Sequence, residues 1–304
     1  MLNGINNKKV VTLRTTTTST TASITAGTYR APLYKVTEET ATLHVSQGNS
    51  KVGKEIYTFS TLPGNLEHML VIKGKDGAED TLLSDVPGTC SKYCDACFNG
   101  GCYAVNSARL HHNAVIQAWA ENTLLLRSGR VWAMIDDFIT KKNAKETKVK
   151  IWRINVSGEL ESVNDIRHWD ELAMKHPEVR FSVYTKNYDA VDEYMTELTR
   201  AGKVETAPNF IINISQWHHC ADAFLAKYPK NSFNVFTYDD SNRKSGAGAD
   251  LSDADRAALG KLVHCPAVTK SGKHAKKPDG TEITCSECQR CYRKTGAETA
   301  VYAH

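Results

Sequence analysis

Seven residues in the middle of the chain decide its fold class: Lys150-Ile151-Trp152-Arg153-Ile154-Asn155-Val156. The run is rich in β-branched and aromatic residues and predicts a buried strand. A helix is expected to follow it, because Ser162 and Asp165 have the spacing of a capping box. The same unit then recurs. Further strands are predicted at residues 180–184, 210–214, 233–238 and 261–264, and further helices at residues 188–200, 217–227 and 252–260.

Strand–helix repeats of this spacing indicate a parallel sheet with helical crossovers. Upstream, residues 104–127 and 131–142 predict two helices that are separated at Gly129. We therefore expect an α/β fold in which residues 41–264 form a partial parallel (β/α) barrel with an N-terminal β-rich extension. Residues 1–40, which include an almost pure Thr/Ser stretch, are expected to be a poorly packed arm. Residues 265–304 form a C-terminal Cys-rich segment.

The composition narrows the class of protein. The chain has 304 residues, a net charge of +4 and a hydrophobic share of 41%, which is enough for a sizeable core. No dense Lys/Arg block occurs outside residues 270–277, so nucleic-acid binding is not indicated. No apolar run reaches the roughly 20 residues that span a bilayer, so no membrane partner is expected. We expect a cytoplasmic protein, where clustered cysteines are more often ligands than disulfides.

The nine cysteines carry the clearest chemical signal. Eight of them fall into two groups, whose short gaps bring several thiolates onto one loop, as a metal ion or an iron–sulfur cluster requires. The first group is Cys90, Cys94, Cys97 and Cys102, and the second is Cys265, Cys285, Cys288 and Cys291. The second group suits either an iron–sulfur cluster or a closed tetrahedral zinc site.

The C-x3-C-x2-C spacing of Cys90, Cys94 and Cys97 resembles the radical S-adenosylmethionine (SAM) superfamily. The resemblance implies a 4Fe–4S cluster whose open iron is chelated by SAM, an external electron donor, and a (β/α) barrel with the cysteine loop after its first strand. Ser157-Gly158-Glu159 resembles the GGE motif that contacts the SAM amino group in that family. The sequence departs from the pattern at Ala96, where an aromatic is usual, and at Ser157, where the first Gly is usual.

A second resemblance covers residues 48–292 and is to the phage "gene product 88" family, which has no settled activity. It rests on Gly48 to Gly53, Thr89-Cys90, Cys102-Tyr103-Ala104, Arg153 to Glu159, Tyr184-Thr185-Lys186, and Cys265-Pro266 with the C-x2-C-x2-C ending. In that family three cysteines match Cys90, Cys97 and Cys102. The choice of cluster ligands among the four cysteines of the first group therefore stays open.

Polar residues end most of the predicted strands, which is where sites lie in parallel α/β folds. Lys186, Asn213 and Ser215 are predicted to contact the ribose and carboxylate of SAM. Arg153 needs a partner inside its strand, and either Glu159 or a ligand carboxylate would serve. The sequence thus predicts a radical SAM-like iron–sulfur enzyme with one or two 4Fe–4S clusters and an unidentified small-molecule or macromolecular substrate. The alternative is a non-catalytic metal-stabilised binding or electron-transfer protein.

Overall fold

The structure is a computed structural model. It describes residues 12–13, 22–23, 32–48, 53, 55–74, 78–94, 97–98, 102–146, 148–217, 219–239, 252–271, 273 and 275–302. The predicted Thr-rich stretch from Thr15 to Thr21, as well as Ala96, His218 and Asp240, lie outside the described residues.

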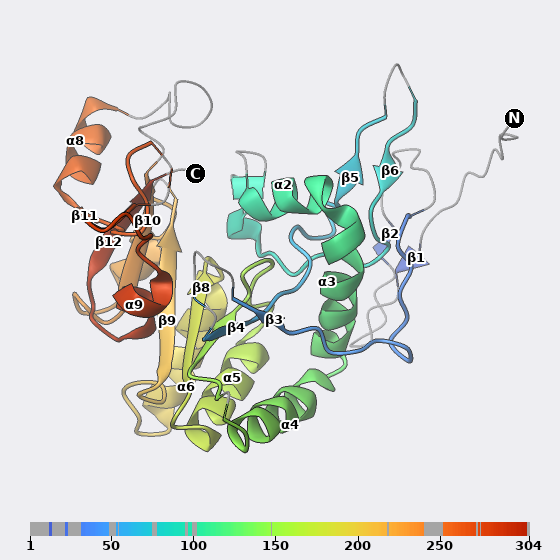
Figure 1. Cartoon of the computed structure of the whole chain (residues 1–304), viewed down its shortest axis with the longest axis horizontal. Coiled ribbons are helices and arrows are strands. Elements are labelled where there is room, and N and C mark those ends of the chain that lie inside the picture. The colour runs from blue at the N-terminus through green and yellow to red at the C-terminus, as the bar shows by residue number, and fades with distance from the viewer. Residues whose placement is uncertain are drawn as a thin grey trace, which may run out of the picture.

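One eight-stranded sheet organises the described chain, with the order β11-β12-β10-β9-β8-β7-β4-β3 (Figure 1). Every neighbouring pair is parallel except β3 and β4. The predicted parallel α/β fold is therefore confirmed at the level of a largely parallel sheet. The strands are β3 (Ser46–Gln47), β4 (Ile56–Phe59), β7 (Ile151–Ile154), β8 (Arg180–Thr185), β9 (Phe210–Gln216), β10 (Asn234–Asp239), β11 (Val263–His264) and β12 (Glu298–Tyr302).

The sheet is wound in one direction, because β4, β7, β8, β9 and β10 are neighbours in the order in which they occur in the chain. Parallel crossovers are almost always right-handed, so strands added in one direction place their helices on the same face. Figure 1 shows α4, α5 and α6 side by side accordingly. The described residues of the two edge strands, β3 and β11, pair only with β4 and β12, respectively.

The helices are mostly amphipathic and their boundaries follow local signals. Ser162 and Asp165 form the predicted capping box at the start of α5, and α6 has the predicted bounds. The helices are α2 (Tyr103–Leu110), α3 (His112–Arg127), α4 (Val131–Asn143), α5 (Val163–Lys175), α6 (Tyr188–Arg200), α7 (Asp222–Leu225), α8 (Asp253–Lys261) and α9 (Cys285–Cys288), with 3₁₀ turns η1 (Lys92–Cys94) and η3 (Arg290–Tyr292). Two short antiparallel pairs complete the described elements: β1 (Thr12–Leu13) with β2 (Ala22–Ser23), and β5 (Val71–Ile72) with β6 (Thr81–Leu82).

Two predicted helices were wrong in extent. The helix expected over residues 104–127 is divided at His111, and both parts pack on the same small core through Val105 and Ile116. The helix expected over residues 217–227 is reduced to α7. His219 has a φ of 56°, which a helix does not allow, and Trp217 stacks on Tyr238. The strand β12 was not predicted.

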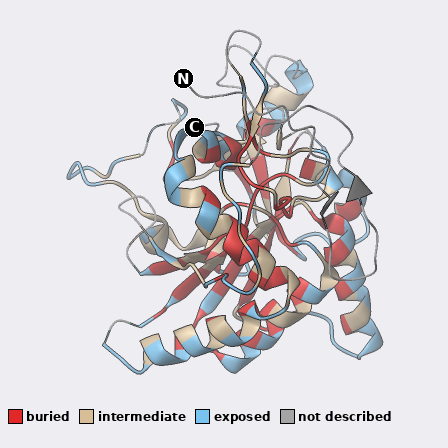
Figure 2. Cartoon of the chain, turned by 90° about the vertical axis from the view of Figure 1, so that its right-hand side faces the viewer, coloured by how far each residue is buried: buried red, intermediate tan, exposed pale blue. Residues whose placement is uncertain are grey.

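The main core lies between the sheet and helices α4 to α6, where Trp152, Phe181 and Trp169 are almost fully buried. The opposite face of β4 and β7 is covered by the C-terminal segment, because Ile56 and Ile151 pack against Tyr292 of η3. Figure 2 shows the buried residues running through the central strands, while the helices at the lower edge are buried on one side only. None of the helices that the structure describes combines the length and apolarity needed to cross a membrane.

Candidate functional site

The first cysteine group begins where the chain returns to the end of β4. The Thr89 N–H donates to Leu62 O over 3.0 Å, and the Cys90 N–H donates to Gly64 O over 2.8 Å. The Gly64 N–H in turn donates to Cys90 Sγ over 3.2 Å. Since residues 62–64 follow β4 directly, Cys90 is fixed near the carboxyl end of the first parallel strand.

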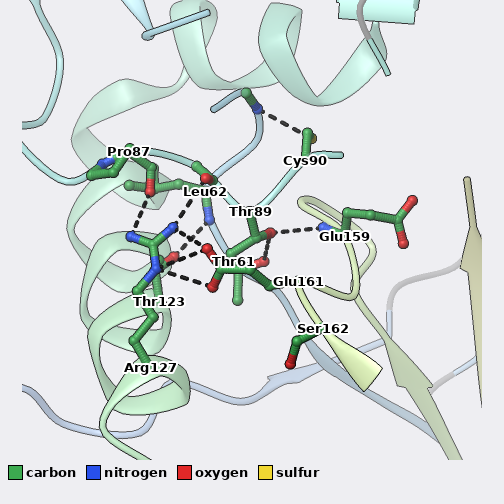
Figure 3. Close-up of polar contacts among 12 residues, drawn as sticks. Thr61, Leu62, Pro87, Thr89, Cys90, Thr123, Arg127, Glu159, Glu161 and Ser162 are labelled. Atoms are coloured by element: carbon green, nitrogen blue, oxygen red, sulfur yellow. Dashed lines mark hydrogen bonds and ion pairs between the residues drawn. The ribbon is translucent and has the colours of Figure 1, made fainter. Parts of the chain in front are cut away.

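Arg127 of α3 clamps this segment from the helix side (Figure 3). Its guanidinium donates to Pro87 O over 3.0 Å and to Gly88 O over 3.1 Å. It also pairs with Glu161, with 2.6 Å between Nη2 and Oε1. The entry to the cysteine loop is therefore held between α3 and the segment that follows β7.

Ser157-Gly158-Glu159 lies directly beside this loop. The Thr61 N–H donates to Ser157 O over 3.0 Å, and the Glu159 N–H donates to Thr89 Oγ1 over 2.8 Å (Figure 3). Gly158 has a φ of 80°, and a Cβ atom there would collide with the Thr61 and Thr89 hydroxyls. Glycine is thus required at this position both by its backbone conformation and by the close approach of two threonines.

The Glu159 carboxylate connects three elements of the site. It is 3% exposed and accepts hydrogen bonds from the N–H groups of Lys186 and Leu160 over 2.7 and 2.8 Å. The Cys94 thiol lies 4.0 Å from Oε2 of the same carboxylate. Burial raises the pKa of Glu159, and the two backbone hydrogen bonds oppose that rise. The ends of β7 and β8 and the cysteine loop therefore meet at one carboxylate.

The four thiols of the first group form two interacting pairs. Cys90 interacts with Cys94, and this contact together with burial raises the pKa of the Cys90 thiol. Cys97 interacts with Cys102 and with Cys94. The neighbouring Cys97 and the N–H groups at the start of α2 lower the pKa of Cys102. The charge of the Lys186 ammonium acts on both members of this second pair.

The second group gathers on the face of the sheet that α4 to α6 leave uncovered. Cys291 lies within electrostatic reach of Cys285 and Cys265, while Tyr292 interacts with Cys288 as well. Burial raises the pKa of the Cys291 thiol to about 12. The backbone of this segment is tied to the sheet, because Ser182 Oγ and Asn213 Nδ2 donate to Cys291 O over 2.8 and 3.1 Å.

The predicted SAM-contacting residues occupy different positions in this arrangement. Lys186 lies beside the first cysteine group. Asn213 is fully buried, and its amide also bonds Ser182, Val183 and Asn234. Ser215 accepts a hydrogen bond from the Tyr188 hydroxyl through its backbone oxygen, over 2.7 Å. The structure thus brings Ser157, Gly158, Glu159 and Lys186 together, whereas Asn213 helps to fasten the C-terminal segment.

The residues present fit a metal cluster in their chemistry. Among the described residues, no three His, Cys, Asp or Glu side chains are already arranged around a metal position. Thiols are nevertheless the ligands of iron–sulfur clusters, and within each group thiols lie within electrostatic reach of one another. Beside the first set, Asn155 Oδ1 and Ser157 Oγ are buried atoms without a hydrogen-bond partner. Buried polar atoms are usually satisfied by the protein, by ordered water or by a bound ion or ligand.

Sequence reasoning missed the hydroxyl pair of Thr61 and Thr89, whose oxygens lie 2.8 Å apart under Gly158. It also missed the contact between Tyr184 and Arg153, in which the guanidinium carbon lies 5.3 Å from the centroid of the tyrosine ring. For the threonine pair, the available signal in the sequence was the position of Thr89 next to Cys90. Glu159 was considered as the partner of Arg153, but its carboxylate lies at the Leu160 and Lys186 N–H groups and at Cys94, and it is not among the main electrostatic neighbours of Arg153.

The chain matches a protein-family model over most of its length. Residues 43–294, well over half of the chain, match the family model described as Gene product 88. No curated protein and no solved structure shows significant similarity to the chain.

Proposed function

The chain belongs to the Gene product 88 family, and we propose that it is a radical SAM-type iron–sulfur enzyme with a second, C-terminal metal cluster. One observation carries the proposal. The thiols of the first cysteine group, the Ser157-Gly158-Glu159 segment and Lys186 meet at the carboxyl ends of β4, β7 and β8. The one-directional winding of the sheet supports the partial (β/α) barrel that this function implies.

The roles of the residues follow from their positions. Cys90, Cys94 and Cys97 would hold a 4Fe–4S cluster, with Cys102 as the alternative third ligand. When bound, the cluster and SAM supply a one-electron reductive cleavage that starts radical chemistry, with the electron coming from an external donor. Glu159 and the backbone carbonyls of Ser157 and Gly158 would hold the SAM amino group, because a cation is best held by a carboxylate and oriented carbonyls. The Lys186 ammonium stabilises thiolates beside it.

The second cysteine group favours a structural role for its metal. Cys285 and Cys291 pack against Ile56 and Ile151 on the open face of the sheet, so a metal bound there also fixes the C-terminal segment on the sheet. Zinc would serve that purpose as well as iron. If both groups served only this purpose, the protein would be a metal-stabilised binding or electron-transfer protein.

Anaerobic reconstitution with iron and sulfide tests the proposal. We expect a brown protein that absorbs near ~400 nm, binds SAM in calorimetric titration, and releases 5′-deoxyadenosine from SAM after reduction with dithionite. An intact cluster without SAM binding at sub-millimolar concentration would reject the enzymatic function. A colourless protein that retains only zinc would reject both cluster assignments.

Single Cys→Ala variants identify the ligands of the first cluster. Cys90→Ala, Cys94→Ala and Cys97→Ala are expected to lose its iron and its absorbance. Cys220→Ala is the matched control, because Cys220 bonds Tyr188 and the Trp217 N–H and belongs to neither group. If Cys94→Ala keeps a full cluster and Cys102→Ala loses it, the ligands are Cys90, Cys97 and Cys102.

A further inference from the structure

Arg153 is a cation without an anionic partner in the described part of the chain. It lies in the middle of β7, opposite Thr58 of β4 and Ser182 of β8, and is half-buried. Its Nε is buried and makes no hydrogen bond. Its guanidinium lies over the ring of Tyr184, with 5.3 Å between Cζ and the ring centroid.

The main electrostatic neighbours of Arg153 include no carboxylate. Its electrostatic neighbours are the hydroxyls of Tyr292, Tyr103 and Tyr184 and the thiol of Cys285. Its neighbours across the sheet are Thr58 and Ser182, neither of which carries a charge. A half-buried guanidinium whose Nε meets no hydrogen-bond acceptor is costly unless a ligand reaches it.

Two further atoms on the same segment are orphaned. Asn155 Oδ1 and Ser157 Oγ are buried and have no hydrogen-bond partner, and the two residues are only 8% and 1% exposed. An orphaned carbonyl oxygen requires a donor, and an orphaned hydroxyl serves as donor or acceptor. The segment from Arg153 to Ser157 therefore carries a guanidinium nitrogen, a hydroxyl and an amide oxygen that make no hydrogen bond within the described chain.

The position of Arg153 relates it to both cysteine groups. Cys285 of the second group is one of its neighbours, and Tyr103, another neighbour, interacts with Cys97 and Cys102 of the first group. Tyr103 is 48% exposed, so the surroundings of Arg153 are accessible from solvent on that side. Lys186 lies with Glu159 and the first group, whereas Arg153 neighbours Cys285 of the second group and Tyr103.

We propose that Arg153 binds the carboxylate or phosphate group of a small-molecule substrate between the two cysteine groups. Asn155 Oδ1 accepts a hydrogen bond from a neighbouring hydroxyl or ammonium group of that molecule. This inference rests on the proposed function, since it places the substrate beside the cluster of the first group. A guanidinium fork matches both oxyanions in geometry.

Anion-dependent stability tests the proposal with inorganic phosphate and acetate as probes. The reconstituted protein is melted in chloride, phosphate or acetate at one ionic strength, and the dissociation constant is obtained from the concentration dependence of Tm. We expect at least one of the two oxyanions to raise Tm above the chloride value. Arg153→Gln should raise the dissociation constant for that oxyanion by on the order of tenfold or more, as expected when a charge-assisted hydrogen bond is lost. Arg200→Gln, at the exposed end of α6, is the matched control and should keep the response.

Asn155→Asp provides a second test in case Arg153→Gln does not fold. An aspartate tolerates the φ of 50° at this position and places a carboxylate on the same segment as Arg153. It should abolish the oxyanion response while leaving the fold intact. An unchanged response in either folded variant, or no oxyanion-specific rise in the parent protein, would overturn the proposal.

Measurements of SAM affinity and of iron content distinguish a substrate oxyanion from the carboxylate of SAM and from a purely electrostatic role of Arg153. They also distinguish failure of the anion site from failure of the enzymatic function. If Arg153 binds the carboxylate of SAM itself, Arg153→Gln will lower the affinity for SAM but not for decarboxylated SAM. The substrate assignment would then fail. If Arg153 only balances the charge of the second cluster, Arg153→Gln will lose iron while keeping the phosphate response, which also overturns the proposal. Absence of SAM cleavage with an intact Arg153-dependent phosphate response rejects the enzymatic function but leaves the anion site.

Discussion

Single residues decide how closely the Ser157-Gly158-Glu159 segment approaches the cysteine loop. Gly158 allows Thr61 and Thr89 to lie where a side chain would otherwise be, and this contact brings the Glu159 carboxylate to 4.0 Å from Cys94 Sγ. The glycine of Ser157-Gly158-Glu159 thus has a local structural role. The second glycine of the GGE motif is kept in this chain, and it is the position that the packing requires.

Gly158→Ala is expected to destabilise the protein by about 3 kcal/mol or more. The left-handed backbone costs roughly 1–2 kcal/mol for a non-glycine residue, and the collision with Thr61 and Thr89 adds an overpacking cost of about 1–3 kcal/mol. Gly202→Ala is the control, because Gly202 has a φ of 72° and open space within 4 Å of the point where a Cβ atom would lie. Urea denaturation measures both. Equal losses of unfolding free energy in the two variants would show that the collision with Thr61 and Thr89 does not contribute to the destabilisation.

At the scale of elements, α3 holds the N-terminal part of the described chain against the sheet. Glu121 accepts hydrogen bonds from the Thr42 N–H and hydroxyl, each over 2.8 Å, and from His44 over 3.0 Å. Asn122 bonds the His44 backbone in both directions, over 2.9 Å. Burial alone would raise the pKa of Glu121, but the bonds from Thr42, Gln117 and His44 lower it to about 2.

This carboxylate makes stability depend on pH in a defined direction. Its pKa is below the ordinary value of 4.5 in the folded protein, so its contribution is fully present above pH 4.5 and is lost as the pH falls towards 2. Glu121→Gln should lose on the order of 1–3 kcal/mol of unfolding free energy at pH 7. The difference from the parent protein should shrink below pH 4.5.

Chemical denaturation across pH 3–8 measures this difference. Glu197→Gln is a suitable control, because Glu197 pairs with Arg167 at the surface with 34% of its side chain exposed, and such pairs contribute about 0–1 kcal/mol. A pH-independent loss in Glu121→Gln would mean that the carboxylate is not the group that titrates.

For the whole molecule, the one-directional winding leaves one face of the sheet to be covered by something other than the crossover helices. The C-terminal segment covers it at β4 and β7, where Tyr292 is 2% exposed. The strand β12 then enters the sheet between β10 and β11. The C-terminal Cys-rich segment therefore shares a core and a sheet with the rest of the described chain.

Tyr292→Ala is expected to lower the unfolding free energy by about 3–5 kcal/mol, as for other large buried aromatics. The variant should still unfold in a single transition, because the segment and the sheet share a core. Leu110→Ala, at a position that is 76% exposed, should change stability by less than about 0.5 kcal/mol. Two separate transitions in a combined calorimetric and fluorescence experiment would contradict a single folding unit.

The sequence by itself determined the features that depend on neighbouring residues. The strand–helix alternation predicted the parallel sheet, residues 188–200 predicted α6, and Ser162 with Asp165 predicted the start of α5. These signals are local, because side-chain periodicity and capping act within one or two turns. The family was also readable from motifs in the chain.

Only the tertiary structure decided which groups meet. Packing of α2 and α3 on one small core divides the long predicted helix at His111. The backbone N–H of Lys186 engages Glu159, which leaves Arg153 without that carboxylate. The C-terminal segment docks on a sheet face more than a hundred residues away in sequence. Such contacts join distant residues, and their energies depend on burial and on competing partners, which no local pattern encodes.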